Sequence, residues 1–151
     1  MKPTIKPINI SFRVFSPQDV DAVLVIEQLA YKTPWRRVQF IQSLSNPNIL
    51  AYLILKDNRI VGYSIALHTL DFTDLLNICI HPQYQHQGLG AQLFNHLLNV
   101  SNIKEIFIEV RVTNYNALLF YKKLGFKVIN IRKKYYLDGE DAKMLHFSIS
   151  S

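Results

Sequence analysis

Two glycines separated by one residue, Gly88 and Gly90, stand between an apolar run at residues 75–80 and an amphipathic run at residues 92–100. The first run has the pattern of a buried strand, and the second has the period of a helix. Glycine lacks a Cβ, so the backbone can approach a ligand closely here, and the unpaired N–H groups at the start of a helix attract anions. The segment therefore predicts a loop that binds phosphate or pyrophosphate.

Two other nucleotide-binding motifs fit this loop less well. A Walker A loop needs Gly-Lys-Ser/Thr, and no such triplet follows the glycines. A Rossmann loop is a closer alternative, because a strand precedes it, a helix follows it, and Glu109 stands about 20 residues further on. However, Leu93 occupies the third glycine position, and seven residues separate Ile80 from Gly88, where a dinucleotide turn needs a tight connection.

Four short patterns resemble those of one enzyme family. The pattern Q-x-x-G-x-G at residues 85–90 resembles the acetyl-CoA pyrophosphate loop of GCN5-related N-acetyltransferases (GNAT), and N-x-x-A-x-x-x-Y-x-x-x-G-F at residues 114–126 is similar to the next helix of that family. E-V-R at residues 109–111 and R-x-x-Y-Y at residues 132–136 resemble one branch, the RimI-type bacterial enzymes that acetylate the N-terminal alanine of a ribosomal protein. The resemblance runs from about Tyr31 to Met144.

The resemblance implies acetyl-CoA as the cofactor and no metal. It places the pantetheine arm along residues 78–80, with a backbone N–H near Ile80 facing the developing oxyanion. His86 stands where many relatives carry arginine, which replaces one fixed cation by a group that is mostly neutral at pH 7 and predicts weaker or pH-dependent cofactor binding. The cofactor-binding residues expected from the resemblance are Ile78, Cys79, Ile80, Gln85, His86, Gln87, Gly88, Leu89, Gly90, Ala91, Asn114 and Ala117.

Acyl transfer from a thioester to an amine needs an unprotonated amine, a stabilised oxyanion and a proton for the departing thiolate. An α-amine has a reference pKa of about 7.7 to 8.0, so a modest base suffices, and Glu109 at the end of an apolar run is the candidate. The Tyr121 phenol, with a reference pKa of about 10, stays protonated and can donate to a thiolate. Resemblance assigns the same two roles. The structural alternatives are that Glu109 is only an exposed carboxylate at the end of a strand, and that Tyr121 belongs to an aromatic stripe in the core.

The acceptor side is defined by aromatic residues. Tyr31 and Trp35, together with Tyr135 and Tyr136, resemble the substrate rim of the RimI-type branch, although core or hairpin packing would explain them equally well. The leading acceptor is thus the N-terminal alanine of a small-subunit ribosomal protein. The alternatives are a lysine side chain or small-molecule amine as the acceptor, or a non-enzymatic module that binds acyl-CoA or the ribosome.

The composition indicates the broad class of protein. A chain of 151 residues with 49% hydrophobic residues predicts one domain, residues 1–151. No apolar run approaches the length of a membrane span and no signal peptide is evident, so a cytoplasmic protein without membrane contact is expected. The single cysteine, Cys79, lies in an apolar run and is interpreted as buried. The net charge of +6 favours polyanionic neighbours, but no aromatic-interleaved basic platform predicts direct nucleic-acid binding.

The elements that must position these residues follow from periodicity and capping signals. Expected strands lie at residues 10–15, 49–55, 60–70, 75–80, 103–110, 126–136 and 143–149, and expected helices begin at Ser16, Trp35, Gly88 and Thr113 or Asn114. This order predicts an α+β fold with a mixed, largely antiparallel sheet of about seven strands and helices on both faces. It matches the GNAT fold, whose fourth and fifth strands run parallel and splay apart to admit the pantetheine arm.

Overall fold

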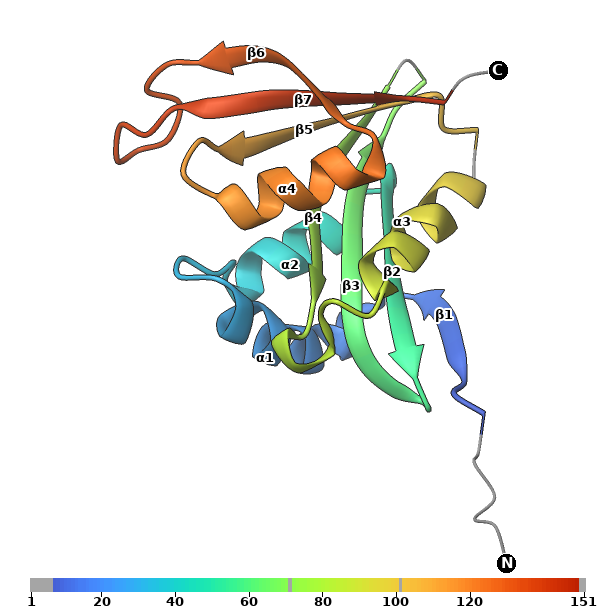
Figure 1. Ribbon diagram of the computed structural model, residues 1–151. Helices are drawn as coiled ribbons and strands as arrows, with labels where there is room; N and C mark the ends of the chain where they lie inside the picture. The colour runs from blue at the N-terminus through green and yellow to red at the C-terminus, as the bar shows by residue number, and fades with distance from the viewer. Residues whose placement is uncertain (1–6, 71, 101, 150–151) are drawn as a thin grey trace, which may run out of the picture.

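A computed structural model describes residues 7–70, 72–100 and 102–149, and within these ranges seven strands form one mixed sheet in the order β1-β2-β3-β4-β5-β7-β6 (Figure 1). The strands are β1 (Ile10–Val14), β2 (Ile49–Lys56), β3 (Arg59–His68), β4 (Thr73–Ile80), β5 (Glu105–Arg111), β6 (Lys127–Arg132) and β7 (Ala142–Ser148). The helices are η1 (Pro17–Asp19), α1 (Val20–Ala30), α2 (Arg37–Leu44), η2 (Pro82–Tyr84), α3 (Leu89–Asn99) and α4 (Tyr115–Leu124). The predicted fold class is confirmed.

The first four strands pair antiparallel in the order in which they occur along the chain. The β2–β3 turn is centred on Asp57 and Asn58, whose φ angles of 50° and 64° are the left-handed values that a two-residue hairpin needs. Aspartate and asparagine tolerate this conformation better than most residues, and this explains why the position of the turn could be predicted from the sequence.

The two faces of the sheet are covered by different helices. On one face, α1 and α2 enclose a core in which Val23, Phe40 and Tyr63 are fully buried. On the other face, α3 and α4 cover a second core that includes Leu93 and Ile106. No helix in the described ranges is long and apolar enough to cross a membrane.

The junction of β4 and β5 is the one parallel pairing in the described sheet. It extends over two residue pairs, Thr73 with Ile106 and Asp74 with Phe107. Beyond Asp74 the two strands diverge, as the β4 and β5 ribbons do in Figure 1, while β5 stays paired with β7 along its whole length. The splay expected from the family resemblance is therefore present, and it leaves a gap beside the last residues of β4.

Several predicted boundaries are wrong by two or more residues, and two of them affect predicted site residues. β6 ends at Arg132 rather than at Tyr136, because the chain turns at Lys134, whose φ angle is 51°. Tyr135 and Tyr136 therefore lie in the connection to β7. The second helix begins at Arg37 and not at Trp35, since Arg36 at its N-cap is extended.

Candidate active site

The main chain of β4 presents polar groups to the gap. The His81 N–H donates to the Val61 carbonyl (2.8 Å), so the N–H and C=O groups of His81 are directed toward β3. Because these groups alternate along a strand, Cys79 also faces β3, whereas Ile78 and Ile80 face the gap. The Gln85 side-chain amide donates to the Ile80 carbonyl (2.9 Å). Of the three residues predicted to meet a ligand through the backbone, two therefore face the gap and Cys79 does not.

The glycine loop leads into the N-terminus of α3. The Gln92 N–H bonded to the Gly88 carbonyl (3.1 Å) starts the helix, so the preceding N–H groups of Leu89, Gly90 and Ala91 have no acceptor within the helix. Three such donors at the positive end of a helix dipole form an anion site. The residues that sequence analysis assigned to a phosphate ligand are thus gathered at one helix end.

The two glycines serve different purposes. Gly88 has a φ of 81°, and a Cβ there would meet open space, so it is the backbone conformation that favours glycine. A Cβ on Gly90 would lie 2.8 Å from the Phe120 ring, so Gly90 permits α4 to approach α3. Both glycines therefore have structural roles besides the predicted close approach of a ligand.

Two cations near this loop were missed by the sequence analysis. The Lys56 ammonium donates to Oε1 of Gln87 (2.9 Å), and an Arg59 guanidinium nitrogen lies 3.5 Å from the Tyr84 hydroxyl. Both cations come from the β2–β3 hairpin, so only the fold brings them to the loop. They supply positive charge behind the segment in which His86 (φ 64°) replaces the expected arginine.

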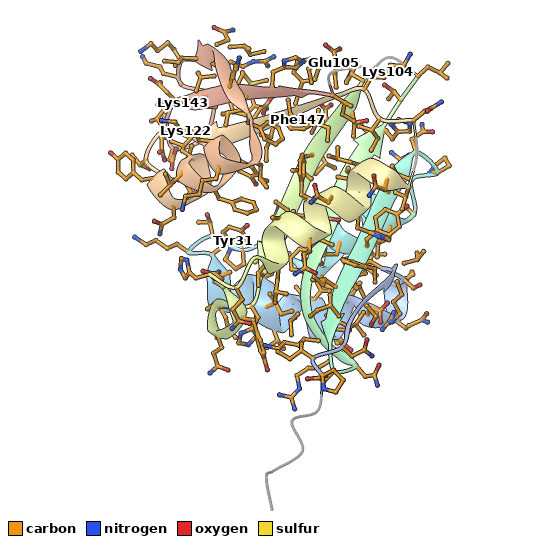
Figure 2. The ribbon with its side chains drawn as sticks, turned by 45° about the vertical axis from the view of Figure 1, so that its right-hand side comes forward. Tyr31, Lys104, Glu105, Lys122, Lys143 and Phe147 are labelled. Carbon is orange, nitrogen blue, oxygen red and sulfur yellow. The ribbon has the colours of Figure 1, made fainter. Side chains whose placement is uncertain are left out.

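Three titratable side chains near the gap influence one another's pKa or are buried together. Tyr121 of α4 is 5% exposed, and burial, followed by the proximity of Cys79, raises the pKa of its phenol. Burial also raises the pKa of Tyr31 (labelled in Figure 2) well above its ordinary value, with further contributions from Cys79 and Tyr121. Burial raises the pKa of the Cys79 thiol to about 12. All three groups therefore keep their protons at neutral pH.

Glu109 lies on the opposite side of the sheet from Tyr121's helix. Its side chain is 30% exposed, with an Arg132 guanidinium nitrogen 3.9 Å away. A hydrogen bond to Glu109 is the largest cause that raises the pKa of Tyr135, and burial followed by the charge of Glu109 raises the pKa of Asp74. Glu109 lies in a groove of about 430 Å³ lined by Phe72, Asp74, Phe107, Glu109, Ile129, Asn130, Arg132 and Met144.

The connection from β6 to β7 is held beside Glu109 by Arg111. One Arg111 nitrogen lies 2.8 Å from Asp138 and 2.9 Å from Glu140, and its guanidinium stacks 3.9 Å from the centre of the Tyr136 ring. Glu140 also accepts from the Thr113 N–H (3.1 Å). Arg111 thus orders the segment that carries two of the predicted rim tyrosines.

Some predicted site residues have structural contacts of their own. Oδ1 of Asn114 accepts from the Ala117 N–H (3.3 Å) and so caps α4. The Trp35 ring packs 5.1 Å from the Phe40 ring in the core under α1 and α2. These contacts explain why the two residues are there without a ligand, and their binding roles stay predictions.

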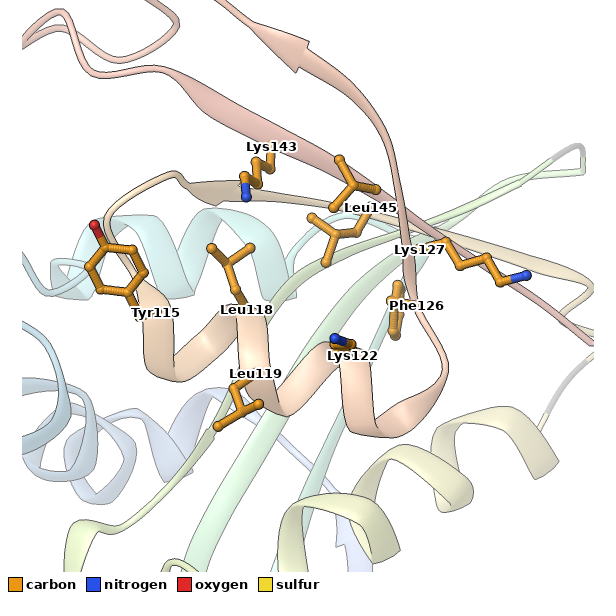
Figure 3. Close-up of a pocket in the computed structure, with 9 residues that line it drawn as sticks. Tyr115, Leu118, Leu119, Lys122, Phe126, Lys127, Lys143 and Leu145 are labelled. Carbon is orange, nitrogen blue, oxygen red and sulfur yellow. The ribbon is translucent and has the colours of Figure 1, made fainter.

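A separate hollow lies between α4 and the β6–β7 pair (Figure 3), bordered by Lys122, Lys127 and Lys143 around an apolar floor that includes Leu145. It contains none of the predicted site residues. Among the side chains that the structure describes, no group of three or more His, Cys, Asp or Glu could hold a metal ion.

A mixed sheet whose parallel strands diverge beside a glycine loop and a helix N-terminus defines the class as an acetyltransferase of the GNAT fold. The family description "Acetyltransferase (GNAT) domain" matches residues 47–128. The chain belongs to the GNAT family, so the expected N-acetyltransferase class is confirmed and a dinucleotide-binding Rossmann site is excluded.

Named relatives indicate which branch of the GNAT family this chain is similar to. The [ribosomal protein bS18]-alanine N-acetyltransferase of Escherichia coli K12 is 34% identical over 138 residues, covering 87% of this chain and 93% of the relative. The protein of the same name from Salmonella typhimurium is 34% identical over 146 residues, covering 91% and 96%. The crystal structure of the Escherichia coli ribosomal-protein-S18-alanine N-acetyltransferase superposes with a TM-score of 0.84 at 31% identity, covering 95% and 96% of the two chains. The resemblance to the RimI-type branch is confirmed.

Proposed function

We propose that this chain is an acetyl-CoA-dependent Nα-acetyltransferase that acts, as a single domain in the cytoplasm, on the N-terminal alanine of a small-subunit ribosomal protein of the bS18 type. The relatives at 34% identity carry this activity in their names. The observation that supports it most strongly is the pair of groups on either side of the β4–β5 gap: a partly exposed carboxylate, Glu109, and a buried phenol, Tyr121. Binding alone would need neither.

The cofactor fits the groups present. The N–H donors of Leu89, Gly90 and Ala91 would hold the pyrophosphate, and the gap-facing groups of Ile78 and Ile80 would pair with the pantetheine arm. When bound, acetyl-CoA supplies an activated acyl group.

A group of this chain can be assigned to each step of the acyl transfer. Glu109, directly or through water, takes the proton from the incoming amine while nitrogen bonds to the acyl carbon. The Ile80 N–H donates to the carbonyl oxygen as negative charge develops there. Tyr121 donates to the sulfur as the carbon–sulfur bond breaks. Glu109 and Tyr121 thus serve as base and acid on opposite sides of the acyl group.

The groove around Glu109 favours an α-amine as the acceptor. An α-amine is about 2 to 3 pKa units less basic than a lysine amine, so a larger fraction is unprotonated at neutral pH and a modest base is adequate. The acidic pair Glu109 and Asp74 also suits a cationic acceptor segment more than an acidic one. We propose no nucleic-acid or membrane contact for this surface.

Peptides that begin with alanine and continue with basic residues should be acetylated far faster than any other amine. The comparison is of initial rates on such a peptide, on the same peptide with a blocked N-terminus, and on a spermidine-like polyamine at equal concentrations. The free peptide should react at least about 100-fold faster than either. If the blocked peptide or the polyamine reacts as fast, the acceptor is a lysine side chain or a small amine and the proposed function is wrong.

We also predict direct transfer without an acetyl-enzyme. Cys79 is the chain's one cysteine, and a thiol whose burial raises its pKa to about 12 is a poor nucleophile at neutral pH. Intact-protein mass spectrometry after incubation with acetyl-CoA alone should show the unmodified mass. A stoichiometric acetyl group on Cys79 would mean a two-step mechanism instead.

A further inference from the structure

A carboxylate with no role in the proposed reaction is buried in the core beneath β4. Glu27 of α1 is 1% exposed. Its Oε2 accepts from the Trp35 N–H (3.0 Å), and its Oε1 accepts from Asn77 Nδ2 (2.8 Å) and from the Tyr63 hydroxyl in a short hydrogen bond. Burying a carboxylate is costly unless such donors surround it, so this cluster needs an explanation beyond packing.

The hydrogen bonds continue from Glu27 to the edge of the gap. Asn77 lies on β4, and its Oδ1 is 3.2 Å from the Tyr31 hydroxyl. The same hydroxyl lies 3.1 Å from the Ile78 carbonyl oxygen, one of the main-chain groups that face the gap. A line of contacts therefore joins a buried helix residue to the strand edge where the acyl group would lie.

The carboxylate fixes the direction of every bond in this line. A carboxylate only accepts hydrogen bonds, so Asn77 must turn its NH₂ group toward Glu27 and its oxygen toward Tyr31. Both neighbours of the Tyr31 hydroxyl are then acceptors, so its single proton is donated to one of them or shared between the two. The Tyr31 hydroxyl therefore acts as a donor toward β4 and accepts no hydrogen bond from Asn77 or Ile78.

β4 needs such support near Asn77. The register between β3 and β4 shifts between the pairs Ala66–Leu75 and Ile65–Asn77, so Leu76 is an extra residue in β4. β4 also loses its pairing with β5 beyond Asp74. Asn77 is the first residue after the shift, and its side chain is anchored to Glu27 in place of a second strand.

We propose that Glu27 is a positioning residue for acyl transfer: acting through Asn77, it orients the Tyr31 hydroxyl and holds the Ile78 edge of the gap. The proposal rests on the proposed acetyltransferase function. The competing explanation is that Glu27 merely stabilises the packing of α1 on the sheet.

The variant Glu27→Gln separates the two explanations, since it keeps the shape of the side chain and introduces a donor where three donors already point. We expect kcat to fall by about 10- to 100-fold, the size of effect that a small misplacement at a reaction centre produces. The KM for acetyl-CoA should change less than about threefold, because the phosphate loop is untouched. The matched control is Val23→Ala, which removes fully buried side-chain volume from the same helix and the same core.

Val23→Ala should lower the melting temperature at least as much as Glu27→Gln while leaving kcat unchanged. Equal losses of kcat in the two variants, or no loss in Glu27→Gln, would overturn the proposal. Tyr31→Phe, which removes the last hydroxyl of the line, provides the second test. If Glu27 acts through Tyr31, the double variant should be no slower than the slower single variant, whereas multiplied losses would mean independent action.

Amide hydrogen exchange tests the positioning role of Glu27 without an amine substrate. In Glu27→Gln, exchange should be faster than in wild type at residues 77–81 and 31–36, and Val23→Ala should not show this local change. Unchanged exchange at these residues in Glu27→Gln would contradict the positioning role. An enzyme that prefers another amine would refute the proposed acceptor, yet the exchange result would still decide the role of Glu27.

Discussion

Replacing Tyr121 by phenylalanine should lower kcat by about 10²- to 10⁴-fold, the usual contribution of a general acid, with little change in the affinity for acetyl-CoA. The substitution removes one hydroxyl and keeps the ring. The centre of this ring lies 5.3 Å from the centre of the Phe120 ring and 5.4 Å from that of the Phe126 ring. Because burial raises the pKa of this phenol, it is protonated throughout the working range and can act as the donor. The measurement is steady-state kinetics combined with a calorimetric titration of acetyl-CoA.

A matched control lies on the same helix. Tyr115→Phe also removes a phenol hydroxyl from α4, but Tyr115 is 73% exposed and lies outside the proposed site, so kcat should stay at the wild-type value. Wild-type turnover in Tyr121→Phe would reassign Tyr121 to core packing. A loss of acetyl-CoA binding as large as the loss of kcat would make it a binding residue instead of the acid.

Replacing Glu109 by glutamine should also lower kcat/KM for an alanine-initiated peptide by about 10²- to 10⁴-fold near neutral pH. The loss should shrink as the pH rises above the reference pKa of an α-amine, about 7.7 to 8.0, because the acceptor then loses its proton to water. The measurement is the ratio of the wild-type and variant rates across this pH range.

Glu105 provides the control for Glu109. It lies four residues earlier on β5, so its side chain points to the same face, and it is paired with His146 at 3.0 Å. Glu105→Gln should leave the rate and its pH profile unchanged. A constant ratio of rates for Glu109→Gln at every pH would show that Glu109 binds or orders the acceptor and does not take its proton.

The parts of the fold that could be predicted from the sequence depend on local interactions. The positive φ angles at Asp57 and Asn58, the left-handed Gly125 that ends α4 (φ 110°) and the Asn114 cap are each decided by a few neighbouring residues. The same holds for the glycine loop, because helix donors and glycine conformations are properties of a short segment. Such features can therefore be recognised in one sequence.

The parts that could not be predicted depend on contacts between distant segments. Lys56 reaches Gln87 across 31 positions, and Glu27 reaches Asn77 across 50. Arg111 was noticed only within a motif, although it holds the connection that carries Tyr136. Trp35 was assigned to the acceptor rim by family resemblance, although an aromatic residue suits a core equally well, and only the fold shows its packing on Phe40.

The most direct test of the central claim uses one peptide that offers both kinds of amine. The peptide begins with alanine, contains one internal lysine, and is incubated with the enzyme and acetyl-CoA until about a tenth has reacted, well within the initial-rate regime. Fragmentation mass spectrometry then locates the acetyl group. The proposed function predicts acetylation of the α-amine with the lysine unmodified. Acetylation of the lysine instead, or no product although calorimetry shows acetyl-CoA bound, would contradict it.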